Sequence, residues 1–111
     1  MATSTIDPMS PYLFYVGNVT STTPRTMTIT GSVVRGLLFC AGRASARTGV
    51  YFLSATYNAN PADNIFETII NASNFSLSMP EANKLVCTSS STSNMGVYLI
   101  LLSDPQYITV T

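Results

Sequence analysis

The chain has 111 residues, 46% of them hydrophobic and only 9% charged, and its five basic side chains balance five acidic ones. This length fits a single domain with its own core, and the apolar content excludes a disordered chain, which would be poor in apolar residues and rich in charge. Zero net charge argues against nucleic acid as a partner, because a nucleic-acid binder needs a positive stripe that displaces counterions from phosphates. A surface of hydroxyls and amides with so few charges is typical of a protein packed into an assembly, since free monomers usually keep a net charge.

The N-terminal segment MATSTIDPMSP has neither the charged n-region nor the apolar h-region of a signal peptide. No run in the chain approaches the roughly 18–20 apolar residues of a membrane span. We therefore expect synthesis in a cytoplasm and no membrane partner. Residues 1–11, which include Pro8 and Pro11, are predicted to form an extended arm with no role in the core.

Short apolar or alternating runs then follow one another along the chain, separated by turn-forming residues. The segments predicted as strands are 12–16, 26–30, 33–41, 49–56, 65–70, 75–79, 84–88, 95–103 and 107–111. Eight or nine short strands with regular turn signals indicate an all-β fold, a single antiparallel β-sandwich of the jelly-roll kind. We expect residues 1–30 to hold the arm and the first strands, and residues 31–111 to form the β-sandwich domain.

Two positions in this pattern leave alternatives open. The segment 65–70 fits one face of a helix, with Asn60 as the cap and Pro61 at the first helical position. The segment is short for a helix and every neighbouring segment is strand-like, so the strand is favoured. Within 33–41, Gly36 indicates either a bulge or a close approach of another backbone.

The most apolar stretch is 95–103, MGVYLILLS, and as a strand it would be apolar on both faces. The segments 49–56 and, less fully, 33–41 share this character. We therefore expect these three strands in one sheet, with one face in the core and the other against a neighbouring subunit; the sequence does not say which face is which. The residues predicted at this oligomer interface are Tyr51, Leu53, Val97, Tyr98, Leu99 and Ile100.

The sequence offers no good candidate for catalysis. It has no histidine, which excludes Ser-His-Asp and Cys-His arrangements. Of the five carboxylates only Asp63 and Glu67 are close in sequence, and a solvated pair is the favoured interpretation. Two cysteines without histidine cannot form a tetrahedral structural zinc site, and Cys40 and Cys87 are either free buried thiols or a disulfide. We therefore predict that the protein is not an enzyme and binds no cofactor or metal.

Two loops are candidates for ligand binding. Arg43 and Arg47 lie close together in GRASARTG, which is either a solvated loop tip or a site for an anion or a partner. Tyr57 and Asn58, together with Tyr51, could line a polar and aromatic surface suited to sugars. The alternative for these tyrosines is packing at a subunit contact, where aromatic residues are also enriched.

Three pieces of the chain, in order, resemble small β-sandwich modules of bacteriophage structural proteins. They are VVRGLLFCAGRASARTGVYFLSATY, FSLSMPEANKLVCTS and the closing GVYLILL, within residues 32–103. Such modules occur at fibre tips, on head fibres and as head-decoration subunits, and they are usually trimeric. The chain departs from a fibre protein in having no long repetitive shaft before the module.

The resemblance implies a non-enzymatic virion structural protein, a homotrimeric head-decoration or fibre accessory subunit made in the host cytoplasm. Its partners would be other copies of itself and other virion proteins, and residues 1–30 would attach it to the particle. The alternative is a carbohydrate-binding module at a tail fibre tip, which would recognise a host-surface glycan.

Overall fold

The computed structural model describes residues 12–43 and 45–111, which form nine β-strands and three short 3-10 turns. The strands are β1 (Leu13–Val19), β2 (Arg25–Ile29), β3 (Val33–Ala41), β4 (Thr48–Thr56), β5 (Ile65–Ile70), β6 (Phe75–Glu81), β7 (Lys84–Ser89), β8 (Met95–Leu101) and β9 (Ile108–Val110). The turns are η2 (Ser45–Arg47), η3 (Pro61–Asp63) and η4 (Pro105–Tyr107). The prediction of an all-β chain is confirmed.

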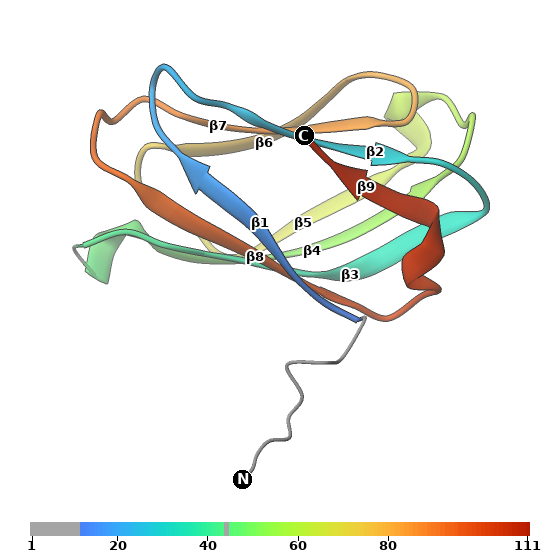
Figure 1. Ribbon diagram of the computed structural model, residues 1–111, viewed down its shortest axis with the longest axis horizontal. Helices are drawn as coiled ribbons and strands as arrows, with labels where there is room; N and C mark the ends of the chain where they lie inside the picture. Colours follow the sequence, from blue (N-terminus) through green and yellow to red (C-terminus); the bar gives the residue numbers. More distant parts are fainter. Residues whose placement is uncertain (1–11, 44) are drawn as a thin grey trace, which may run out of the picture.

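The strands form two packed antiparallel sheets, the β-sandwich that the sequence predicts (Figure 1). The five-stranded sheet has the order β1-β8-β3-β4-β5, and the four-stranded sheet has the order β6-β7-β2-β9. Strands from the start of the chain pair with strands from its end: β8 lies between β1 and β3, and β2 lies between β7 and β9. Segments from both ends of the chain thus meet within each sheet, while β3, β4 and β5 follow one another as neighbours in the larger sheet.

The core lies between the sheets and takes alternate side chains from each strand. Met27 and Ile29 of β2 and Leu85 of β7 are fully or almost fully buried. Because β2 is an inner strand of its sheet, the division expected between residues 30 and 31 is wrong. The sandwich begins with β1 at Leu13, while residues 1–11, predicted to be an arm, lie outside the described residues.

Strand β5 is the segment for which the sequence allowed a helix, and the strand is confirmed. The helix-start signals before it nevertheless form a short 3-10 turn, η3. The side chain of Asn60 accepts a hydrogen bond from Ala62 N at 3.0 Å, and Pro61 opens η3. The chain leaves this turn after Asp63, because the following residues pair with β4 over the whole of β5.

Gly36 lies in β3 where that strand passes β8. A Cβ atom at this position would clash with the carbonyl oxygen of Ile100. The pairing of β3 with both neighbours is regular through Gly36, so the close backbone approach is confirmed and there is no bulge. The part of the chain that the structure describes contains no helix with the length and apolar character needed to cross a membrane.

Candidate interaction surface

Strand β8 decides which face of the five-stranded sheet is which. Val97 and Leu99 have no exposed surface and pack in the core, whereas Tyr98 and Ile100 are 43% and 38% exposed. Leu102, just after the strand, is 64% exposed. Because alternate side chains of a strand share a face, the even-numbered residues of β8 lie on the outside of the sandwich.

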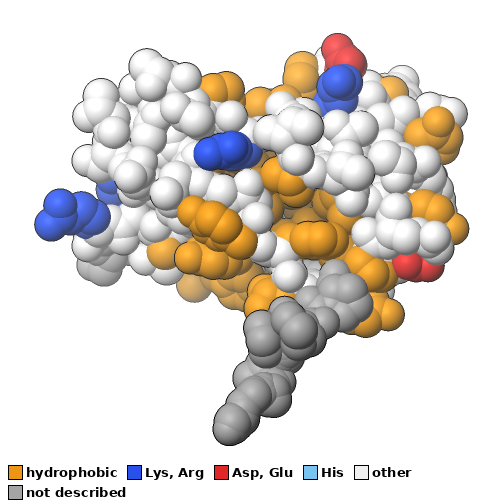
Figure 2. Space-filling model, in the orientation of Figure 1, with side chains coloured by type: hydrophobic (Ala, Val, Ile, Leu, Met, Phe, Trp, Pro, Cys, Tyr) orange, Lys and Arg blue, Asp and Glu red, His pale blue; other side chains and the backbone are white. Residues whose placement is uncertain are grey.

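Strand register extends this outward surface across the whole sheet. The first row is Tyr15, Tyr98, Phe39, Val50 and Ile70, and the second is Leu13, Ile100, Leu37, Phe52 and Glu67. A third row is Leu102, Arg35, Ser54 and Ile65. We call these three rows the outer face. Neighbours on it touch: the rings of Tyr15 and Tyr98 lie 5.1 Å apart. Figure 2 shows hydrophobic side chains gathered where Figure 1 places β1 and β8.

The corresponding surface of the four-stranded sheet is polar. Its outward side chains, which alternate with the core residues, are Thr26, Thr28, Ser76, Ser78, Lys84, Val86, Thr88 and Thr109. One valine stands among hydroxyl-bearing side chains and a lysine. A sheet that packs on the core with one face and meets water with the other is expected to look like this, so the five-stranded sheet is the unusual one.

The outer face is large enough for a specific protein contact. Five strands spaced about 4.8 Å apart and three rows about 6.6 Å apart cover roughly 480 Å². The largest apolar patch on a typical monomer is about 300–600 Å² and often has a function. A stable interface buries about 800 Å² on each partner, so this apolar region could form its centre, with the surrounding polar residues as its rim.

Charge is nearly absent from this surface. Arg35 lies in the third row, where its Nε donates a hydrogen bond to Ser54 Oγ at 3.2 Å. Glu67 lies on β5, the edge strand of the sheet. Apart from Arg35, Ser54 and Glu67, the outer face contains only aliphatic and aromatic side chains. Depletion of charge is what distinguishes the centre of a protein interface from other surfaces.

The outer face contains only two of the six residues predicted at the oligomer interface. Tyr98 and Ile100 are on it. The other four, Tyr51, Leu53, Val97 and Leu99, are at most 6% exposed; they belong to the core of this chain, which corrects the prediction, because a core side chain cannot contact a neighbouring subunit.

The prediction missed the other apolar residues of the outer face. They are the half-buried Leu37, Phe39, Val50 and Phe52 of β3 and β4 and the exposed Leu13, Tyr15, Ile65, Ile70 and Leu102. The signal that could have identified them is that both the odd-numbered and the even-numbered residues of those strands are apolar, so one of the two sets must face outward.

The arginine loop is not a solvated tip throughout. Arg43 is exposed, but Arg47 is only 9% exposed, and its Nη2 donates a hydrogen bond to the carbonyl oxygen of Ser93 at 3.2 Å. Its Nε is buried and has no hydrogen-bond partner among the residues that the structure describes. Arg47 therefore holds the loop between β7 and β8 against the turn between β3 and β4, whereas Arg43 is on the surface.

Tyr57 and Asn58 lie at the other end of β4 from Arg47. Tyr57 is 42% exposed. Asn58 is engaged within the chain, because its backbone N donates to Asn83 Oδ1 at 2.7 Å and its Oδ1 accepts from Asn83 Nδ2 at 2.8 Å. This pairing engages the backbone N and the side-chain oxygen of Asn58 within the chain. The structure does not bring Tyr51 to this loop either, since Tyr51 packs in the core.

Both cysteines are free and buried, one in each sheet, which resolves the alternative left by the sequence. Burial raises the pKa of the Cys40 thiol, and it raises the pKa of Cys87 to about 12. Neither thiol is therefore prepared for nucleophilic chemistry, which requires the thiolate. Within residues 12–43 and 45–111, no three His, Cys, Asp or Glu side chains are placed to hold a metal ion.

Comparisons with known proteins identified no relative of this chain. No protein-family model matches the chain, and searches of curated proteins and of solved structures found no significant match.

Proposed function

We propose that this protein is a non-enzymatic structural subunit that forms a homo-oligomer through the outer face. The observation that supports this function is the contrast between the two sheets, one polar and the other apolar on its solvent side. Covering exposed apolar surface is the main favourable term in protein association. The contact area is set by the sheet itself, so the subunit would need no rearrangement to use it.

A second copy of the same chain is the simplest partner for such a surface. The chain has no net charge, so copies do not repel one another over long distances. Soluble proteins most often assemble with identical copies in closed symmetry. The sequence resemblance suggests a bacteriophage virion as the larger assembly, a trimer as the oligomer, and head decoration or a fibre accessory as the position.

Light scattering of the purified protein at micromolar concentration tests the proposal. We expect a mass that is a whole multiple of the 11.9 kDa chain, with three copies as the order suggested by the resemblance. A stable, well-behaved monomer would overturn the proposal. Imaging of an assembled particle that carries the tagged subunit would then separate head, tail and fibre positions.

A further inference from the structure

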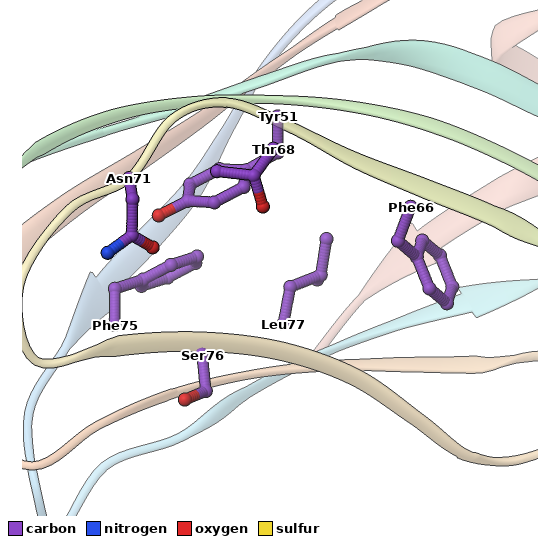
Figure 3. A pocket seen from close by; sticks show the side chains of 7 residues that line it. All are labelled: Tyr51, Phe66, Thr68, Asn71, Phe75, Ser76 and Leu77. Atoms are coloured by element: carbon purple, nitrogen blue, oxygen red, sulfur yellow. The ribbon is translucent and has the colours of Figure 1, made fainter.

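A cavity of about 220 Å³ opens at the edge of the sandwich where β5 faces β6 (Figure 3). These are the edge strands of their two sheets, and no strand pairing joins them. The apolar part of the lining consists of Tyr51, Phe66, Phe75 and Leu77. This site is separate from the outer face, because these side chains point into the space between the sheets.

The apolar wall is fixed in place. The hydroxyl of Tyr51 accepts a hydrogen bond from Ala72 N at 2.9 Å, and the Tyr51 and Phe75 rings lie 5.3 Å apart and 36° from parallel. Both residues are less than 9% exposed. A ligand would therefore meet a surface that already has its bound shape, which limits the entropy lost on binding.

Two polar side chains stand over this wall. Figure 3 shows the hydroxyl of Thr68 and the amide of Asn71 directed toward the cavity, while the hydroxyl of Ser76 points away from it. Thr68 and Asn71 are exposed, and their side chains make no hydrogen bond to the part of the chain that the structure describes. Between them they offer donors and acceptors at the mouth of the cavity.

The lining restricts the chemistry of a ligand. It contains no charged side chain, so nothing in it would compensate a ligand charge removed from water. The volume is below the roughly 300–1,000 Å³ of sites for drug-sized molecules and above the roughly 150 Å³ cavity that holds benzene. The space therefore fits one six-membered ring with small substituents.

We propose that this cleft binds a single neutral pyranose, with an apolar face of the ring on Phe75 and Leu77 and its hydroxyls on Thr68 and Asn71. A wholly apolar ring would cover these two polar side chains without replacing their bonds to water, which is unfavourable. A pyranose has hydroxyls around an otherwise apolar ring and would satisfy both kinds of surface. The proposed sugar site thus lies at the β5–β6 edge and not at the Tyr57 loop. Binding there does not depend on the proposed oligomer.

Titrations followed by two-dimensional NMR of the backbone amides would test the site. The probes are the methyl glycosides of glucose, galactose and mannose, methyl N-acetylglucosaminide, and cyclohexanol as the apolar ring. We expect at least one sugar to give saturable shifts at millimolar concentration, centred on Thr68 and Asn71. Absence of saturable shifts with every sugar would overturn the proposal, and so would tighter binding of cyclohexanol than of any sugar.

Variants with one functional group removed make the test specific. Thr68→Val keeps the side-chain shape and should weaken binding about fivefold, which is about 1 kcal/mol at 1.4 kcal/mol per factor of ten. Asn71→Ala should weaken it by a similar factor. Ser76→Ala is the matched control. Ser76 also lines the cleft, but its hydroxyl points away from the cavity, so its removal should not affect binding. Wild-type binding by both test variants, each shown to be folded by its spectrum, would also refute the site.

Discussion

Two substitutions at neighbouring positions of β8 separate the core from the proposed contact. Leu99 has no exposed surface, whereas the adjacent Tyr98 is 43% exposed on the outer face. Replacing each with aspartate introduces the same charge on opposite sides of one strand. We expect Leu99→Asp to abolish folding, and Tyr98→Asp to leave a folded monomer.

The effect on the core follows from burial. Truncating a buried leucine costs about 2–5 kcal/mol, and an unpaired carboxylate in its place adds several kcal/mol more. A chain of this length has a total stability of about 6–17 kcal/mol, at roughly 0.05–0.15 kcal/mol per residue. Leu99→Asp therefore removes most or all of the stability of the fold.

The effect at Tyr98 is small within one chain and large between chains. The folded monomer loses the ring contact with Tyr15, worth about 0.5–1.5 kcal/mol, and up to about 1 kcal/mol of strand preference. In the oligomer, the exposed part of the ring is roughly 85 Å² of apolar surface, or about 2 kcal/mol of lost burial. An unpaired carboxylate at a dry contact adds a similar amount, so each contact weakens by about 4 kcal/mol, or about a thousandfold.

Light scattering combined with thermal unfolding measures both effects on the same samples. Thr28→Asp is the matched control, because Thr28 lies on the polar side of the four-stranded sheet opposite Lys84; this variant should keep the wild-type mass. The reasoning is refuted if Tyr98→Asp is folded and still has the wild-type oligomer mass. A folded Leu99→Asp would show that the assignment of the two faces is wrong.

Three further predictions concern the fold. Gly36→Ala should destabilise the protein by about 1–3 kcal/mol in a denaturant titration, because the new Cβ meets the carbonyl oxygen of Ile100; an unchanged midpoint would contradict this contact. The raised pKa of Cys87, about 12 against an ordinary 9.0, means that the folded state keeps a proton that the unfolded chain releases. Stability should therefore be unaffected by this thiol below pH 9.0 and fall as the pH rises toward 12, with a smaller alkaline loss in Cys87→Ala. Deleting residues 1–11 should leave the melting temperature nearly unchanged, since the described residues already form both sheets; failure of the shortened chain to fold would show that the segment is part of the sandwich.

The sequence predicts best where a strand is apolar on one side only. In β2 the alternation places Met27 and Ile29 in the core and the threonines outside, as the structure has them. Strand β5 is also predicted, because the segment is short and its neighbours are strand-like, although the residues before it carry the signals of a helix start. Local signals set the turn at Asn60 and Pro61, and pairing with β4 makes Ile65–Ile70 a strand.

The pattern of the sequence could not decide the faces of β8. A strand with two apolar sides satisfies the core equally well in either orientation, and a shift of one residue exchanges the two. The register with β1 and β3 resolves this, because it places Ile100 opposite Leu13 and Leu37 on the outside. The cleft at Thr68 and Asn71 is also invisible in the sequence, since it exists only where the edges of two sheets meet.

The fold itself does not require the outer face to be apolar. A β-sandwich needs only one apolar surface on each sheet, the one that faces the core. The four-stranded sheet follows this rule, because its outward side carries mainly threonine, serine and lysine. Outward leucine, isoleucine, phenylalanine and tyrosine on five adjacent strands add nothing to the core and lower solubility. Where a sequence departs from the pattern of its own fold without a gain in folding, the gain is expected in function. We propose that the gain here is a contact with another protein molecule, and the scarcity of charge on this surface favours a permanent contact over a transient one.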